Sequence, residues 1–266
     1  MKIKFYKYHG TGNDFILIDN RLQNVTLASE DIIRMCERRY GIGADGLIFL
    51  QHHPDYDFEM KYYNADGSPA TMCGNGGRCI SALAAHLGIG GENLRFIAGD
   101  GPHQALILSV QGLVSSIRLS MRDVPAGKPD KRDYLFNTGT PHFVRFLRDA
   151  NDPDFDTISE GRSIRYHERF ASTGINVNFV SALGDGIFVR TYEKGVEDET
   201  LSCGTGVTAS ALAWAMEQDL TKGPVSVRTR GGLLYVDFLR NQEGFRDIWL
   251  TGPAVQTFEG AFEITQ

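Results

Sequence analysis

Short runs of apolar residues, separated by Gly, Asn and Asp turns, make up most of the chain. They predict strands at 15–18, 47–50, 58–63, 105–110, 175–180, 187–192 and 233–239. Because these runs do not alternate with helical patterns, we expect mainly antiparallel sheets rather than a parallel βαβ sheet.

Three segments have helical patterns. The first runs from Ser29, the expected N-cap, to Arg39 and stops before Gly41. The other two begin directly after Cys73 and Cys203, in stretches rich in Ala and Leu on nearly every face. A helix that is apolar all round is a buried helix, so we expect each of these two to pass through a sheet of its own.

The sequence repeats itself at an offset of about 130 residues. Phe58 matches Phe188, Tyr62 matches Tyr192, and the Cys-Gly-x-Gly motif at Cys73 matches the one at Cys203. The order of these matches is the same in both halves, which predicts two similar domains. The segment 122–133 is rich in Pro, Gly and charged residues and is the expected linker.

Composition and charge narrow the classes of function that fit this chain. With 42% hydrophobic and 23% charged residues, the 266-residue chain has the composition of a globular protein. The chain has 33 acidic and 27 basic residues, and the basic residues form no continuous run. This charge distribution excludes the basic surface that a nucleic-acid-binding protein needs, and it favours a small-molecule partner. The opening residues form no basic and apolar leader, and no apolar run reaches 18 residues, so we expect a cytoplasmic protein without membrane contact.

Two of the four cysteines stand in a chemically special place. Cys73 and Cys203 each precede a Gly-x-Gly turn that opens a helix, where unpaired N–H groups and the helix dipole favour anions and a thiolate. Cys36 and Cys79 have no counterpart in the other half and are expected to be buried structural residues. The four are too scattered for a disulfide framework and lack zinc-site spacing, so free thiols and no metal are expected.

Two thiols on opposite sides of a small carboxylate would suit a racemase or epimerase. One thiolate removes the α-proton and the other thiol returns one to the opposite face, with no cofactor required. The alternative is an amino-acid-binding protein that uses the two turns only as carboxylate sites. Two stretches that fit a dinucleotide fingerprint, at 41–46 and 204–209, are set aside because the first follows a helix and the second belongs to the repeated cysteine motif.

The sequence resembles the diaminopimelate epimerase family along its whole length. The resemblance is carried by segments that include both cysteine motifs: 9–15, 41–46, 63–68, 72–76, 175–179, 192–195 and 199–206. It implies an α+β fold of two pseudo-symmetric domains, each a mainly antiparallel sheet wrapped around a central helix. It also implies that a final strand, at 258–264, returns to the first domain, so the domains are expected at 1–122 plus 255–266 and at 123–254.

The family's activity is the cofactor-independent epimerisation of LL-diaminopimelate to the meso form, in lysine and peptidoglycan-precursor synthesis. The resemblance implies Cys73 and Cys203 as the acid and base, and His142 and Glu193 as residues that tune the thiols. The substrate-binding residues that it implies are Asn13, Asn64, Gly74, Asn75, Asn176, Glu193, Lys194, Gly204 and Thr205. A homodimer is a further possibility, weakly favoured by exposed sheet edges.

Three positions depart from the family pattern. Gly46 stands where some members carry Gln, Thr140 stands where Asn is common before Pro-His, and Lys194 replaces an Arg after Glu193. An ammonium cannot grip a carboxylate bidentately as a guanidinium does, so contact with the distal carboxylate is expected to be weaker. Related isomerases of the proline racemase and phenazine-synthesis types are neighbouring alternatives, and the latter lacks the paired thiols.

Overall fold

The computed structural model describes residues 1–127, 129–130 and 133–264. Its contacts divide the chain into two units: unit 1 is Met1–Leu119 together with the segment from Gly252, and unit 2 is Ser120–Thr251. Both boundaries lie three residues before the expected ones. No helix of the described residues is long and apolar enough to cross a membrane.

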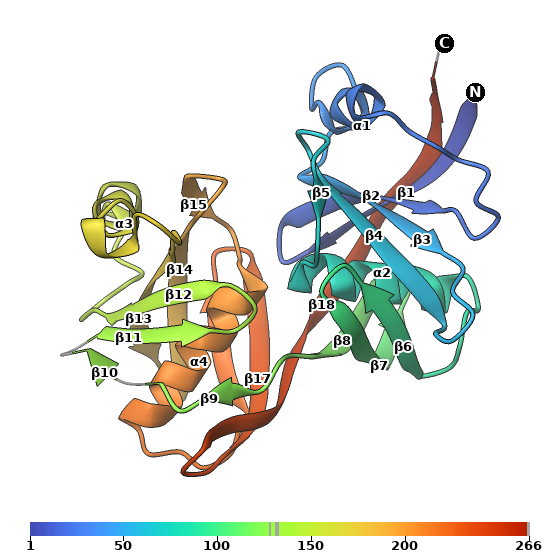
Figure 1. Cartoon of the computed structure of the whole chain (residues 1–266). Helices are drawn as coiled ribbons and strands as arrows, with labels where there is room; N and C mark the ends of the chain where they lie inside the picture. Colours follow the sequence, from blue (N-terminus) through green and yellow to red (C-terminus); the bar gives the residue numbers. More distant parts are fainter. Residues whose placement is uncertain (128, 131–132, 265–266) are drawn as a thin grey trace. The chain divides into compact units, whose positions relative to one another are not determined.

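Unit 1 is a sheet wrapped around one helix (Figure 1). Its elements are β1 (Lys2–Gly10), β2 (Asn13–Asp19), α1 (Ser29–Cys36), β3 (Gly46–Gln51), β4 (Phe58–Asn64), β5 (Pro69–Ala70), α2 (Gly74–His86), β6 (Asn93–Ala98), β7 (Gly101–Gln111) and β8 (Val114–Ser120). Strands pair in the order β1-β2-β3-β4-β6-β7-β8, and β5 pairs with β4. The last strand, β18 (Gly244–Glu263), pairs with both β8 and β1 and closes the ring.

Unit 2 repeats this plan. Its elements are β9 (Val124–Pro125), β10 (Pro129–Asp130), β11 (Asp133–Asn137), β12 (Pro141–Phe146), α3 (Thr157–Arg165), a 3-10 turn (Glu168–Phe170), β13 (Asn176–Leu183), β14 (Gly186–Glu193), β15 (Asp198–Thr200), α4 (Gly204–Glu217), β16 (Val225–Thr229) and β17 (Gly232–Arg240). The order is β11-β12-β13-β14-β16-β17-β18, with β15 on β14. The two units therefore share one topology, as the sequence repeat predicts.

The sheets are mainly antiparallel, but each unit contains two parallel pairs. These are β2 with β3 and β4 with β6 in unit 1, and β12 with β13 and β14 with β16 in unit 2. A parallel pair needs a crossover, and a helix lies in each of these crossovers: α1, α2, α3 and α4 in turn. The fold prediction is confirmed, with these helical crossovers as the detail that periodicity alone did not show.

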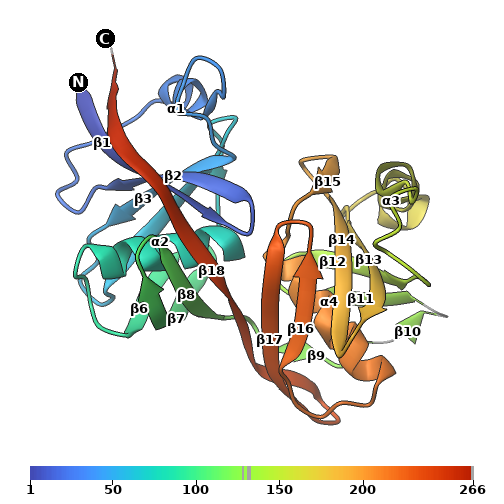
Figure 2. The ribbon, with the colours of Figure 1, turned by 180° about the vertical axis from the view of Figure 1, so that it is seen from behind.

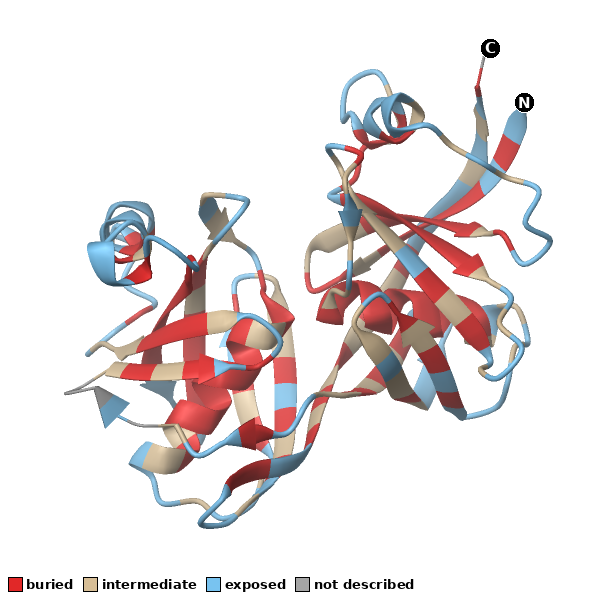
Figure 3. Ribbon diagram, in the orientation of Figure 1, coloured by how far each residue is buried: buried red, intermediate tan, exposed pale blue. Residues whose placement is uncertain are grey.

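Helices α2 and α4 are the buried centres of their units, as their apolar sequences predict. Most residues of the two helices are buried (Figure 3). Helix α2 contacts β1, β2, β3 and β7, and α4 contacts β11 to β14, β16 and β17. Each helix begins directly after its cysteine, because Cys73 and Cys203 hold extended N-cap conformations. Burying one Leu side chain fully, as with Leu83 or Leu212, contributes about 1.5–3 kcal/mol.

The two smaller helices differ from the expectation. The N-cap of α1 is Ala28 rather than Ser29, and Asp31 accepts a hydrogen bond from the Ala28 N–H at 3.2 Å. The helix ends at Cys36 rather than Arg39. Helix α3 was not expected, because its sequence lacks a strong apolar stripe; the repeat does indicate it, since α3 occupies the crossover that corresponds to α1.

The expected linker is partly built into unit 2. Within 122–133, β9 pairs with the start of β18 and β10 pairs with β11. Lys128, Lys131 and Arg132 lie outside the described residues. The return of the final strand to unit 1 is confirmed: β18 pairs with β1 from Val255 to Glu263, and Figure 2 shows it as the long red strand.

Gly161 offers a test of how tightly the peripheral helix packs. A Cβ placed there would lie 2.4 Å from Cβ of Tyr192 on β14. That atom is attached directly to the backbone, so a side-chain rotation cannot move it. Although alanine is the better helix former by about 1 kcal/mol, we expect Gly161→Ala to lower the free energy of unfolding by about 1–2 kcal/mol. Denaturant unfolding measures this change in the free energy of unfolding. Gly91→Ala is the control, because no atom lies within 4 Å of a Cβ added at that position. Equal stability of Gly161→Ala and wild type would contradict the packing.

Candidate functional site

The predicted site residues gather at one edge of each sheet. In unit 1, β2 and β3 begin at this edge and β4 ends there, which brings together Asn13, Gly46 and Asn64. In unit 2, His142 and Asn176 are paired near the starts of the parallel strands β12 and β13, and Glu193 ends β14. The strand registers therefore place residues from distant parts of the sequence side by side within each unit.

Cys73 lies against the side chain of Asn13. Its Sγ is 3.5 Å from Asn13 Oδ1, and the same oxygen accepts a hydrogen bond from Asn75 Nδ2 at 3.2 Å. Asn64 turns its amide toward Ser68 Oγ, at 3.1 Å. The structure thus joins Cys73, Asn13 and Asn75 in one hydrogen-bonded group, with Asn64 at the same sheet edge.

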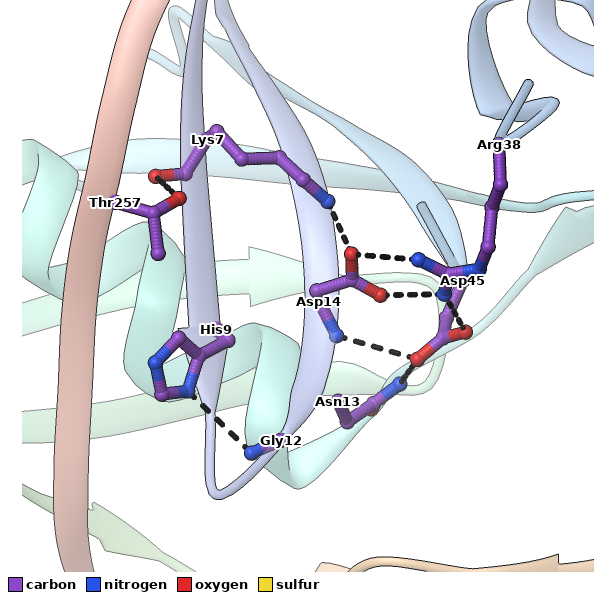
Figure 4. A network of polar contacts seen from close by, with 8 residues as sticks. All are labelled: Lys7, His9, Gly12, Asn13, Asp14, Arg38, Asp45 and Thr257. Carbon is purple, nitrogen blue, oxygen red and sulfur yellow. Dashed lines mark hydrogen bonds and ion pairs between the residues drawn. The ribbon is translucent and has the colours of Figure 1, made fainter. Parts of the chain in front are cut away.

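A carboxylate fixes the orientation of the Asn13 amide. Asn13 Nδ2 donates to Asp45 Oδ2 at 2.7 Å (Figure 4). Because a carboxylate only accepts, the amide nitrogen faces Asp45 and the amide oxygen is the atom left to face Cys73. Asp45 in turn accepts from Arg38 Nη2 at 2.6 Å. Arg38 also donates to Asp14, and Asp14 forms a second ion pair with Lys7. Burial alone would raise the pKa of Asp14, but the hydrogen bonds and charges of Arg38 and Lys7 lower it to about 2.

A fully buried arginine lies behind the first turn of α2. Arg78 donates to Asn75 Oδ1 at 2.9 Å, to the carbonyl of Gly74 and to Thr11 Oγ1, both at 3.3 Å, and to the carbonyl of Pro253 at 3.4 Å. All these acceptors are neutral. Burial lowers the pKa of this guanidinium, although arginine keeps its proton in proteins. Its positive charge adds to the preference of the helix N-terminus for an anion.

Cys203 lies against a hydroxyl rather than an amide oxygen. Its Sγ is 3.4 Å from Thr205 Oγ1, which is itself 2.8 Å from His142 Nε2. Thr140 Oγ1 is 3.0 Å from the same ring nitrogen. Gly206 allows this approach, since an added Cβ would lie 2.4 Å from Asn178 Oδ1 and 3.3 Å from His142 Cε1.

His142 is completely buried in unit 2. Burial lowers its pKa from 6.5 to about 3, so the ring is neutral at ordinary pH. Its other nitrogen, Nδ1, is 3.0 Å from Asn178 Nδ2. The structure therefore connects His142 to Cys203 through Thr205.

The remaining predicted residues of unit 2 lie beside this group. Asn176 Nδ2 donates to Thr140 Oγ1 at 3.1 Å, and Asn176 Oδ1 accepts from the backbone N–H of Lys194 at 2.8 Å. The Lys194 ammonium is exposed and donates to the carbonyl of Thr173 at 2.8 Å. Glu193 is half-buried at the end of β14.

One departure from the family pattern has a local cause. A Cβ at Gly46 would lie 2.6 Å from both the Tyr62 ring and the Tyr63 carbonyl oxygen. A longer residue here would need Tyr62 to move, so glycine suits this chain's own packing.

The other two cysteines are buried, as expected. Burial raises the pKa of Cys36 to about 11 and that of Cys79 to about 12, which keeps both as inert thiols. All four cysteines lie outside any disulfide. Among the described residues no group of three or more His, Cys, Asp and Glu is arranged to hold a metal ion. A surface hollow on α3, lined by Ser159, Arg162, Ser163 and Tyr166, contains none of the predicted residues.

Sequence reasoning assigned no role to the residues that support the site. Asp45 lies in the segment 41–46, Asn178 lies in the apolar run 175–180, and Arg78 follows the first Gly-x-Gly turn. Asn178 did carry a signal, because it is a polar residue within the apolar run 175–180, and such a residue needs a partner when buried. Which partner it finds depends on the strand pairing, which the sequence pattern does not give.

Comparisons with known proteins point to one family. The family profile described as diaminopimelate epimerase matches residues 5–105 and 134–257. The chain is 45% identical over 259 residues to the diaminopimelate epimerase of Flavobacterium psychrophilum, covering 97% of this chain and 99% of that protein. It is 38% identical to the diaminopimelate epimerase of Aquifex aeolicus, covering 97% of each.

Solved structures share the fold at low sequence identity. A phenazine biosynthesis protein of the PhzF family from Bacillus anthracis matches with a TM-score of 0.77 at 15% identity, covering 99% of this chain and 100% of that chain. A hydroxyproline epimerase from Agrobacterium vitis, solved with trans-4-hydroxy-L-proline, matches with a TM-score of 0.71 at 13% identity, covering 100% of this chain and 93% of that chain.

The buried His142 predicts a loss of stability in acid. Because its folded pKa of about 3 lies below the ordinary 6.5, the unfolded chain binds the proton first. Its contribution is complete above pH 6.5 and is lost as pH falls toward 3, by up to about 1.4 kcal/mol per pH unit. Denaturant unfolding from pH 7 to pH 4 should show a shallower pH dependence for His142→Gln than for wild type. His52→Gln, at an exposed position, is the matched control; equal slopes for all three proteins would contradict the prediction.

Proposed function

Because the chain belongs to the diaminopimelate epimerase family and is an isomerase of the epimerase class, we propose that it interconverts LL- and meso-2,6-diaminopimelate without a cofactor. Cys73 and Cys203 are the proposed acid and base. The product would serve lysine and peptidoglycan-precursor synthesis.

The observation that carries the proposal is the duplicated N-cap cysteine. Each sulfur stands at the start of a buried helix, next to a glycine that lets a ligand approach the backbone. The first N–H groups of a helix have no partner within it and attract a carboxylate, while the sulfur reaches the adjacent carbon. Inversion at a stereocentre needs one such group on each face of the α-carbon, and the duplicated fold provides one in each unit.

The surroundings of the two sulfurs differ in a way that suits opposite roles. Cys73 faces the Asn13 oxygen, which can only accept, so the position favours an S–H that donates to it. Cys203 faces the Thr205 hydroxyl, which is able to donate to a thiolate. We therefore assign Cys203 as the group that takes the first α-proton and Cys73 as the group that returns one.

The assigned binding residues suit a substrate with two ammonium and two carboxylate ends. In this proposal the turns at Gly74-Asn75 and Gly204-Thr205 bind the reacting carboxylate. The carbonyl of Asn64 and the carboxylate of Glu193 accept from ammonium groups, and Lys194 attracts the distal carboxylate. Asn13 and Asn176 line the reacting centre beside the sulfurs.

Removal of either sulfur should abolish inversion. We expect Cys73→Ala and Cys203→Ala each to reduce the rate by at least about 100-fold, the low end of what acid or base catalysis contributes. Proton NMR of LL-diaminopimelate in D2O, with reduced protein and no added cofactor, follows the α-proton and the stereoisomer ratio. Cys36→Ala is the matched control, since that thiol is buried in α1, and it should keep the activity.

Two outcomes would contradict the proposal. Folded, reduced wild-type protein that exchanges no α-proton would exclude epimerisation of this substrate. A protein that binds diaminopimelate equally well with and without the two sulfurs, and never inverts it, would be a binding protein instead.

The departure at Lys194 predicts a specific effect on substrate affinity. Its ammonium has three N–H donors, and the Thr173 carbonyl takes one of them, so donors remain for a carboxylate. We expect Lys194→Ala to raise KM about tenfold with a smaller change in kcat, and Lys194→Arg to retain or lower KM. Steady-state kinetics measures both, with the exposed Lys4→Ala of unit 1 as control. An unchanged KM in Lys194→Ala would exclude the role.

A further inference from the structure

Asn178 is a completely buried amide behind His142, and its orientation is determined by its other partners. Its Nδ2 is 3.0 Å from the carbonyl oxygen of Phe143, which can only accept. Its Oδ1 is 2.9 Å from Thr191 Oγ1, which donates to it. The amide nitrogen therefore faces the ring, and it donates to His142 Nδ1 at 3.0 Å.

This donation decides which ring nitrogen of His142 carries the proton. A neutral imidazole has one N–H, and a nitrogen that accepts a hydrogen bond is the one without it. Since Nδ1 accepts from Asn178, the proton is on Nε2. The contacts at Nε2 agree, because Thr205 Oγ1 at 2.8 Å and Thr140 Oγ1 at 3.0 Å are both able to accept.

Asn176 is consistent with the same assignment. Its amide nitrogen also lies near Nε2, at 3.4 Å, and two N–H groups do not bond to each other. That nitrogen has a better acceptor in Thr140 Oγ1 at 3.1 Å, while its oxygen accepts from the Lys194 backbone. The hydrogen-bond partners of His142 are therefore all neutral, and nothing in this group favours a charged ring.

We propose that Asn178 is a positioning residue for Cys203: it holds His142 as the Nε2–H tautomer, and the ring makes Thr205 Oγ1 an acceptor. The Thr205 hydroxyl, whose oxygen is 3.4 Å from Cys203 Sγ and 3.3 Å from Thr140 Oγ1, then donates its hydrogen to the sulfur. The inference rests on the proposed function and specifies how the polar group behind one of its two cysteines works. It assigns His142 the role of a fixed donor rather than of a base that withdraws the cysteine proton.

The proton count follows from this arrangement. When Cys203 takes the α-proton, the C–H bond breaks, an S–H bond forms and the electron pair stays on the α-carbon. His142 keeps one proton throughout. A role as base would put a second proton on Nδ1, directly against the Asn178 N–H, and would create a buried cation whose hydrogen-bond partners are neutral.

The tautomer is measurable in the wild-type protein without substrate. Nitrogen NMR of the full chain labelled in histidine should show His142 with a protonated Nε2 and a bare Nδ1, unchanged from pH 8 to pH 5. His142→Gln assigns the signal by its disappearance. A protonated Nδ1 in this pH range, in either the neutral or the charged ring, would overturn the inference.

The carboxylate variant tests the part played by Asn178. Asn178→Asp keeps the shape but cannot donate to the ring, so we expect Nδ1 of His142 to become protonated. Unchanged His142 signals in a folded Asn178→Asp protein would overturn the role. The wild-type measurement remains decisive if this buried variant does not fold.

The last link is tested at Thr205 through the titration of thiolate absorbance. In a Cys73→Ala background, the difference between proteins with and without Cys203 isolates that sulfur, since Cys36 and Cys79 ionise only in strong base. Thr205→Val, which lacks the hydroxyl, should move the midpoint of thiolate formation about one pH unit higher, and Thr205→Ser should leave it near wild type. Equal midpoints in the two variants would overturn the donation to sulfur.

These readouts separate the inference from the proposed function. They contain no substrate, so a protein that meets them all but does not epimerise diaminopimelate would refute only the proposed function. An active epimerase with the proton on Nδ1 would refute only the inference.

Discussion

A helix enclosed by a sheet begins among polar side chains that are largely buried, and this constraint explains most of what surrounds the two cysteines. Helices α2 and α4 are buried along nearly their whole length. The amides, hydroxyls and charges near their first turns must therefore find partners inside the unit, because an unpaired buried polar group costs about 1–3 kcal/mol. In unit 1 Arg78, Asn75 and Thr11 satisfy one another; in unit 2 His142, Thr205 and Asn178 do so. The side chains that complete these buried hydrogen bonds also form the polar surroundings of the two sulfurs.

The two units have the same topology but use different side chains to complete the hydrogen bonds at the start of the central helix. The position of Arg78 in α2 corresponds, 130 residues on, to Thr208 in α4, whose hydroxyl donates to the Gly204 carbonyl. Unit 1 thus has a buried cation and a fixed amide oxygen beside its sulfur, whereas unit 2 has a neutral imidazole and a hydroxyl. A duplicated fold provides two equivalent positions, and divergence of the neighbouring side chains makes them chemically unequal. In the proposed reaction one sulfur acts as the acid while the other acts as the base, and the different neighbours of the two sulfurs suit that division of roles.

The sequence predicted the parts of this structure that depend on local pattern or on repetition. The two buried helices and the duplicated cysteine motif were visible in this way, because an all-apolar helix and a repeated motif are local signals. The return of the last strand followed instead from the resemblance to the diaminopimelate epimerase family. The parallel strand pairs were not predicted. Strand β2 pairs with β3 only after the α1 crossover, and the residue pattern of a strand does not indicate which strand it pairs with. Helix α3 was missed because its face is weakly apolar, although the repeat alone would have placed it. Asp45 and Asn178 act across strands, so their roles follow only from the register that sets Phe15 beside Gly46 and His142 beside Asn176.

That register is also what gives the site its rigidity. Asn13, Asn64, Asn176 and Glu193 stand at the first or last positions of strands, and Asn75 and Thr205 stand in the first turns of α2 and α4. Backbone hydrogen bonds of strands and helices therefore hold their Cα atoms. A second layer, Asp45 behind Asn13 and Asn178 behind His142, then fixes which atom of Asn13 faces Cys73 and which ring nitrogen of His142 faces Thr205. An amide or imidazole that was free to flip would present a donor and an acceptor by turns, and the protonation preference of its cysteine would be averaged away. Under the proposed function, the backing residues thus give two equivalent backbone positions the different surroundings that an acid and a base require.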